Sequence, residues 1–196
     1  MLDELLFSLN LIIQQTKNNA QTLAIIVSIP WIVYFFSVIN RNILLAGIIP
    51  RHLFGIQGII FAPLLHANFN HLFFNSIPLA VLSNSILING LHYFLTITLL
   101  ITLMSGTAIW LFAKPGLHIG ASALITGYWG FLVINMYHSN SLATLILGLI
   151  SLYYFAGIFL GIFPSEKGVS WEGHLFGFLA GLITSYLLNQ HLVSLI

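Results

Sequence analysis

Long apolar segments alternate with short connections that carry polar residues, glycine or proline. Six of these segments approach the length that a helix needs to cross the hydrocarbon core of a bilayer, which is about 20 apolar residues. We therefore predict a bundle of six membrane-spanning helices and an all-α fold. The expected spans are residues 22–39, 69–88, 91–113, 121–137, 142–163 and 172–188.

The connection between the first two predicted spans, residues 40–68, has a different pattern. It is apolar, yet it is interrupted by Pro50, Gly55, Gly58 and Pro63, which disfavour a continuous helix. Irregular backbone at membrane depth is tolerated only where protein or water satisfies its polar groups. We expect this segment to be a loop that lies partly in the membrane interface.

The first 20 residues precede the predicted bundle. The run from Leu5 to Ile13 is amphipathic but too short to span a bilayer, so it predicts an interfacial helix. The polar run from Gln14 to Gln21 predicts a break before the first span. We therefore expect one domain over residues 1–196, with an N-terminal interfacial segment at 1–20 and a six-helix core at about 22–190.

Composition supports a membrane location and excludes several function classes. The chain is 59% hydrophobic and only 5% charged, whereas about a quarter of the residues in a soluble domain are charged. We predict an integral, multi-pass protein of the bacterial cytoplasmic membrane. The formal net charge of +1 predicts no nucleic-acid partner, and the absence of cysteine excludes thiol catalysis and disulfides.

Ser122 is the first candidate for chemistry. Serine in a membrane helix most often bonds to its own backbone or fills a helix contact. Ser122, however, begins the fourth predicted span among the small residues Gly120, Ala121 and Ala123. Free N–H groups at a helix start can stabilise a developing negative charge, so Ser122 is a candidate nucleophile.

His174 is the second candidate, at the start of the sixth predicted span. Gly173, Gly177 and Gly181 recur at a spacing of four, so they share one helix face. Small residues allow helices to approach closely in lipid. We expect this face to pack on the fourth span and to bring His174 to Ser122, where a neutral imidazole can accept the serine proton. A structural hydrogen-bonding role is the alternative.

The census of acidic residues limits the possible mechanisms. The four acids, Asp3, Glu4, Glu166 and Glu172, all lie outside the middle of a predicted span. An aspartyl protease needs two neighbouring carboxylates, so the census weighs against this class. A Ser-His-Asp triad lacks its acid, because Glu172 is poorly placed to orient His174. A Ser-Lys dyad would need Lys114, which lies in a predicted loop. A Ser-His dyad is the most that the sequence can form.

The second predicted span adds a polar cluster. His71 and Asn75 are four residues apart and share a helix face, and both offer N–H donors for an oxyanion. We expect His66 to tie down the preceding loop. A metal site formed by His66, His71 and His174 is the alternative, because three histidines can bind zinc.

Three separated motifs resemble the rhomboid family of intramembrane serine proteases. They are His71-x-x-x-Asn75, Gly120-Ala-Ser122 and His174-x-x-Gly177-x-x-x-Gly181, in that order. The resemblance implies that Ser122 is the nucleophile and His174 the general base. It also implies that Asn75, His71 and the Ser122 N–H form an oxyanion hole in which Gly120 leaves room. The implied partners are transmembrane protein substrates and the lipid bilayer, with no metal or cofactor.

The sequence departs in three places from patterns that are frequent in this family. Ala123 follows the serine where many members have glycine, Gln57-Gly58 stand at the place of a Trp-Arg pair, and Thr126 replaces an aromatic residue. Two other functions stay open. One is a non-catalytic rhomboid-like protein that binds transmembrane clients and escorts or retains them, and the other is a small transporter or channel.

The expected orientation depends on which argument is used. Four basic residues fall on one side of the predicted bundle and one falls on the other, so the positive-inside rule places the four in the cytoplasm. The family resemblance implies a cytoplasmic N-terminus, which is the opposite orientation. We prefer the second, because four bases against one are little evidence. The bases are Arg41, Arg51, Lys114 and Lys167 on one side and Lys17 on the other.

Overall fold

The structure, a computed structural model, describes residues 2–138, 141–163 and 170–193. Helices form the regular structure of these residues, apart from an isolated antiparallel bridge between Ile48 and His118. The predicted all-α class is therefore confirmed for the described residues. The α-helices are α1 (Leu2–Asn18), α2 (Ala20–Ile39), α3 (Gly58–Phe61), α4 (Phe69–Leu87), α5 (Leu91–Phe112), α6 (Ser122–His138), α7 (Leu142–Phe155), α8 (Gly157–Leu160) and α9 (Trp171–Val193), and the 3₁₀ helices are η1 (Arg41–Ala46), η2 (Leu53–Gly55) and η3 (Ala62–Leu64).

The helices match the predicted spans in order, with two differences in extent. The segment predicted as a fifth span, 142–163, is not one helix, because α7 ends at Phe155 and the short α8 follows. The last helix continues past Leu188 to Val193. Within the described part of the chain, α2 and α5 are long and apolar enough to cross a membrane. The count of six spans stays a prediction.

The N-terminal segment is more helical than its polarity predicts. Helix α1 continues through Gln14 to Asn18, so the predicted break at 14–21 is wrong, and the interruption is confined to Asn19. Two long-range hydrogen bonds hold the polar residues against the end of α4. Asn84 Nδ2 donates to Thr16 Oγ1 at 2.9 Å, and Asn19 Nδ2 donates to the Leu87 carbonyl at 3.0 Å.

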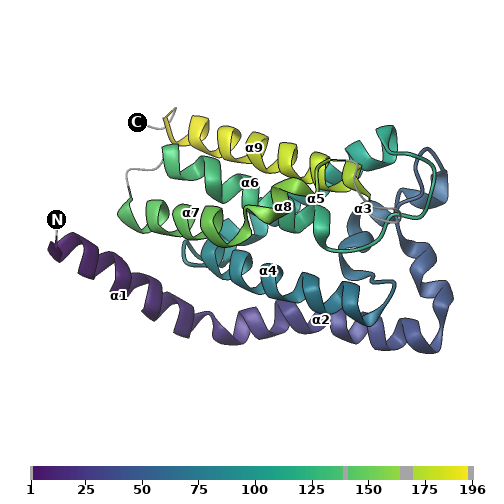
Figure 1. Ribbon diagram of the computed structural model, residues 1–196, viewed down its shortest axis with the longest axis horizontal. Coiled ribbons are helices and arrows are strands. Elements are labelled where there is room, and N and C mark those ends of the chain that lie inside the picture. Colours follow the sequence, from purple (N-terminus) through teal and green to yellow (C-terminus); the bar gives the residue numbers. More distant parts are fainter. Residues whose placement is uncertain (1, 139–140, 164–169, 194–196) are drawn as a thin grey trace.

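Figure 1 shows the longer helices lying roughly along one axis, with α3 at one end and the start of α1 and the end of α9 toward the other. Helix α6 is central, because it packs against α4, α5, α7 and α9. Both α6 and α9 begin at the end where α3 lies. The first residues of these two helices, which include Ser122 and His174, are therefore placed at the same end of the bundle.

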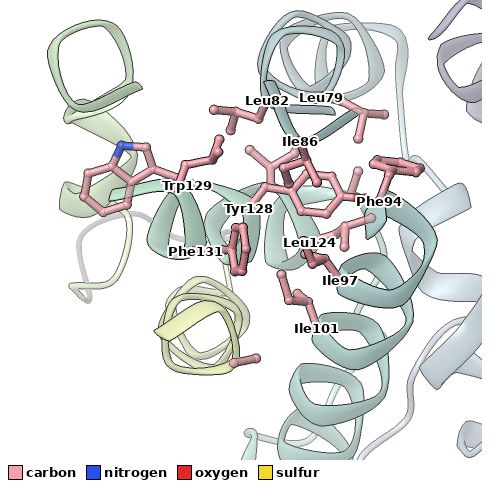
Figure 2. Close-up of a cluster of buried hydrophobic side chains, with 14 of the residues drawn as sticks. Leu79, Leu82, Ile86, Phe94, Ile97, Ile101, Leu124, Tyr128, Trp129 and Phe131 are labelled. Atoms are coloured by element: carbon pink, nitrogen blue, oxygen red, sulfur yellow. The ribbon is translucent and has the colours of Figure 1, made fainter. Parts of the chain in front are cut away.

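Apolar side chains of α4, α5 and α6 form the centre of the molecule (Figure 2). Leu82, Ile97 and Tyr128 are almost fully buried there. Many other large apolar side chains point outward, which is expected where lipid replaces water as the solvent. In lipid, close packing rather than removal from water holds such helices together. Exposed examples are Ile32, Phe35, Ile39, Leu95, Leu99 and Ile183.

The loop between α2 and α4 is fixed to the end of α5 by an arginine. Arg51 adopts a positive φ of 59°. Its guanidinium donates to the carbonyls of Leu111 and Ala113 at 3.0 and 2.9 Å, and its N–H donates to the Trp110 carbonyl at 2.9 Å. The last carbonyls of a helix lack intrahelical partners and carry partial negative charge. Arg51 therefore anchors the loop although Gln57-Gly58 replace the Trp-Arg pair.

Candidate active site

A cavity of about 760 Å³ lies between the first loop, α4, α5 and the starts of α6 and α9. A smaller one of about 210 Å³ lies between α4, α6, α8 and α9. Asn75, Ser122 and His174 line both cavities. The five residues that the sequence predicts for the site all line the larger one, and they are His71, Asn75, Gly120, Ser122 and His174.

The packing of α6 on α9 brings Ser122 and His174 into this space. A Cβ atom on Gly177 would overlap the Ala123 carbonyl, and one on Gly181 would overlap the Gly127 carbonyl. The two helices are thus in backbone contact, as the glycine spacing predicts. Gly173 differs, since its nearest neighbours would be at ordinary contact distances of 3.5 Å and more.

Ser122 is the first residue of α6 and is half-buried. The first N–H groups of a helix have no partner within the helix, so they are available to a ligand. Within the described residues, no hydrogen bond joins the Ser122 hydroxyl to His174. Bonds between catalytic groups are often long without substrate and shorten when it binds. The geometry thus places the two side chains at one cavity without pairing them.

His174 is oriented by a main-chain carbonyl. Its Nδ1 lies 2.9 Å from the Gly161 carbonyl oxygen. A carbonyl can only accept, so Nδ1 carries the proton, and Nε2 of the neutral ring is left as an acceptor. The ring lies so close that a Cβ on Gly161 would come within 2.9 Å of its Cε1. The Gly161 carbonyl thus fixes the tautomer, a task that an acid performs in a catalytic triad.

His66 has a more specific place than a loop anchor. It is only 1% exposed, and its Nε2 lies 3.2 Å from Asn75 Nδ2 and 3.5 Å from the Ala121 N–H. Both partners are donors, so Nε2 accepts and Nδ1 carries the proton. Burial, followed by the neighbouring charge of His71, lowers the pKa of His66 from 6.5 to about 4. His66 is therefore neutral near pH 7 and directs one N–H of Asn75 away from solvent.

Gly120 leaves room for the ring of His71. Its φ is +119°, which L side chains rarely adopt, and a Cβ would lie 2.6 Å from His71 Cε1 and Nε2. The Gly120 N–H donates to the Ala62 carbonyl at 2.9 Å, which fixes this segment to the first loop. Glycine at this position is thus required by backbone conformation and by space.

The comparisons with known proteins identify the family. The sequence matches the model of the Rhomboid domain over residues 54–191, which is more than half of the chain. The chain belongs to the rhomboid family. All five predicted site residues lie within the matched range. Together with the two long apolar helices, family membership indicates a membrane protein.

Two curated relatives of this rhomboid are described as uncharacterized proteins. One, from Mycobacterium tuberculosis (strain ATCC 25618 / H37Rv), is 41% identical over 152 residues, which cover 73% of this chain and 63% of the relative. The other, from Mycobacterium leprae (strain TN), is 39% identical over 142 residues, which cover 67% of this chain and 56% of the relative. This rhomboid thus spans less than two thirds of the length of either relative.

The structure also bears on the alternatives to a serine site in this rhomboid. Among its described residues, no group of three His, Cys, Asp or Glu side chains is arranged to hold a metal ion. The Nδ1 of His174 faces Gly161 rather than Glu172, whose Oε1 is buried without a hydrogen-bond partner. Gly161 and His66 could not be assigned these roles from the sequence, because both lie in irregular segments and act through contacts distant in sequence.

Proposed function

We propose that this rhomboid is an intramembrane serine endopeptidase that cleaves transmembrane segments of membrane-anchored proteins. The observation that carries the proposal is the meeting of Ser122, His174 and Asn75 at one pair of cavities, with His174 held as an Nε2 acceptor. These residues come from α4, α6 and α9, and their types are those that acyl transfer needs. Family membership supports the same reaction.

The first half of the reaction forms an acyl-enzyme. Ser122 Oγ attacks the carbonyl carbon of the scissile peptide while His174 Nε2 takes the hydroxyl proton. The oxyanion that forms accepts hydrogen bonds from Asn75 Nδ2, a ring N–H of His71 and the Ser122 N–H. The C–N bond then breaks, and His174 returns the proton to the leaving amine.

The second half releases the new carboxyl end. Water attacks the ester carbonyl, and His174 takes the water proton and passes it to Ser122 Oγ as the C–O bond breaks. This step needs water inside the membrane region. Polar side chains that line the larger cavity, among them Asn70, Asn75 and Ser170, are suited to hold water there. The reaction uses no metal or cofactor, and we propose the bacterial cytoplasmic membrane as its location.

Labelling with a fluorophosphonate probe tests the proposal, because the probe reacts with an activated serine. Detergent-purified protein is compared with Ser122→Ala and His174→Ala. Ser28→Ala serves as a matched control, since Ser28 is exposed on α2 and bonds to its own helix at the Ile25 carbonyl. We expect labelling of the parent and the control, none of Ser122→Ala, and a sharp decrease in His174→Ala.

A parent protein that folds but is not labelled either lacks an activated serine or excludes the probe from its site. Incubation with a membrane-reconstituted transmembrane substrate then distinguishes the remaining possibilities. Cleavage products that require Ser122 would show a protease that excludes the probe. Stable association without cleavage would instead indicate a non-catalytic protein that binds transmembrane segments.

A further inference from the structure

The backbone just before Ser122 is fixed to the first loop. His118 and Ile48 exchange two main-chain hydrogen bonds of 2.9 and 3.0 Å. The N–H of Gly120 donates to the Ala62 carbonyl at 2.9 Å. These bonds attach the main chain of residues 118–120 to the first loop. They do not attach it to α9, so a connection to α9 has to come from another contact.

The His118 side chain makes that contact. Its Nε2 lies 2.9 Å from the Lys114 carbonyl oxygen, and its Nδ1 lies 3.0 Å from Ser170 Oγ. Because the carbonyl only accepts, Nε2 carries the proton, and Nδ1 of a neutral ring accepts from the Ser170 hydroxyl. The Ser170 oxygen in turn accepts the Gly173 N–H at 3.2 Å. Each group in this series thus has a compatible donor or acceptor.

Ser170 directly precedes α9, and its bond to Gly173 is that of an N-cap residue. His118 lies four residues before Ser122, and Ser170 lies four residues before His174. Both His118 and Ser170 line the larger cavity. A side-chain hydrogen bond at the level of the site therefore connects the segment just before α6 to the residue just before α9.

We propose that the His118–Ser170 pair is a positioning device that holds Ser122 and His174 at the separation needed for proton transfer. This inference rests on the proposed protease function. Neither residue touches the reacting atoms. The pair acts because misplacement by about 1 Å can lower a rate by about a hundredfold. On α9 the close glycine contacts with α6 begin at Gly177, after the first turn of the helix. The His118–Ser170 bond adds a contact just before that first turn.

Four variants separate this role from general stability. His118→Phe removes both ring hydrogen bonds and keeps the ring. Ser170→Ala removes the hydroxyl. Ser170→Asn keeps an acceptor for the Gly173 N–H and an N–H donor for His118, so it should restore function. His92→Phe is the matched control, because His92 is exposed near the start of α5.

Two measurements are made on each purified variant of the whole 196-residue chain. The first is the kinetics of fluorophosphonate labelling, which separates the maximal inactivation rate from the probe concentration at half-maximal rate. The second is hydrogen–deuterium exchange of residues 117–120 and 171–176, which does not depend on activity. We expect a maximal rate about tenfold lower in His118→Phe and Ser170→Ala, with the half-maximal concentration nearly unchanged. Exchange should rise in both segments together, and Ser170→Asn and His92→Phe should resemble the parent.

The possible failures can be told apart. Unchanged exchange in both His118→Phe and Ser170→Ala would overturn the connection itself. Faster exchange with an unchanged labelling rate would reduce the pair to a structural contact and overturn its positioning role. A parent that neither reacts with the probe nor cleaves a transmembrane substrate would overturn the proposed protease function, and with it the catalytic purpose of the pair, while the exchange data would still report whether the two segments are connected.

Discussion

His174 obtains its orientation from the Gly161 carbonyl, and this contact leaves no space for a larger residue at position 161. A methyl group there would meet the Nδ1 and Cε1 atoms of the imidazole. The ring would have to turn or shift, which would move Nε2, the proposed proton acceptor. At the scale of single residues, the site thus depends on a position that carries no reactive side chain.

We predict that Gly161→Ala lowers the maximal rate of phosphonate labelling by about tenfold to a hundredfold, because the base is displaced. The matched control is Gly157→Ala in α8, where a Cβ would meet nothing within 4 Å. The measurement is the labelling rate of both variants at equal folded fraction. Equal rates for Gly161→Ala and the control would contradict the role of this carbonyl.

His66 predicts a dependence of stability on pH. Its pKa of about 4 in the folded protein is below its ordinary value of 6.5. The unfolded chain therefore binds more protons between these values, and the free energy of unfolding falls as the pH decreases from 6.5 to 4. Above pH 6.5 this contribution is constant. Between high and low pH, the lowered pKa of His66 changes the free energy of unfolding by about 3 kcal/mol, since one pKa unit equals about 1.4 kcal/mol.

The comparison of the parent with His66→Gln tests this effect, because the variant lacks the titrating group and keeps an amide that can bond to Asn75. Unfolding in detergent is followed between pH 7 and pH 4. We expect the parent to lose stability more steeply than His66→Gln over this window. Parallel curves would show that His66 is not held neutral by the fold.

At the scale of helices, several boundaries follow directly from the sequence. The starts of α4, α5, α6 and α9 lie within one residue of the predicted spans, because each follows a polar, proline-containing or glycine-containing connection. The interruption at Ala156, between α7 and α8, could not be predicted from the sequence. The apolar residues continue through it, so the segment has the same pattern as one continuous span. The polar part of α1 bonds to α4 through Thr16 and Asn84, and no local pattern in the sequence encodes this contact.

The same distinction holds for the site. His71 and Asn75 could be paired from helical spacing, and Ser122 with His174 from their places at the starts of glycine-rich spans. The family resemblance joined the two pairs into one predicted site. His118 and Ser170 could not, because a histidine and a serine in connections normally face solvent, and their hydrogen bond joins residues that are far apart in sequence. Residues that react can be recognised by type, whereas residues that position them are recognised only through contacts.

Helix α9 offers a direct test of the glycine face. We predict that Gly177→Ala destabilises the protein by about 1–3 kcal/mol, as overpacking of a close contact does. The reason is that its methyl group would overlap the main-chain carbonyl of Ala123, which cannot move independently of α6. Gly173→Ala, one turn earlier on α9, is the matched control because its methyl group would have ordinary contacts. The midpoints of thermal unfolding in detergent are compared for the two variants. Equal midpoints would show that α6 and α9 accommodate the added methyl group without loss of stability.

At the scale of the whole molecule, orientation decides where a substrate would be cut. Helix α5 is one of the two helices that satisfy the length and hydropathy needed to cross the membrane within the described residues. Asn89 and Lys114 lie just beyond its two ends and are exposed. The site lies at the Lys114 end, because His118 bonds to the Lys114 carbonyl and lines the larger cavity. Labelling these two positions therefore reports which side of the membrane the site faces.

The chain contains no cysteine, so a single introduced thiol is the only target for a maleimide. We predict that Lys114→Cys reacts with a membrane-impermeant maleimide in intact bacterial spheroplasts, and that Asn89→Cys reacts only after lysis. This follows from a cytoplasmic N-terminus, which places the loop between α2 and α4 and the start of α6 outside. The positive-inside rule gives the reverse, because Arg41, Arg51 and Lys114 share one side. Labelling of Asn89→Cys in intact spheroplasts, with Lys114→Cys protected, would show that the few charges determine the orientation and that the cavity opens toward the cytoplasm.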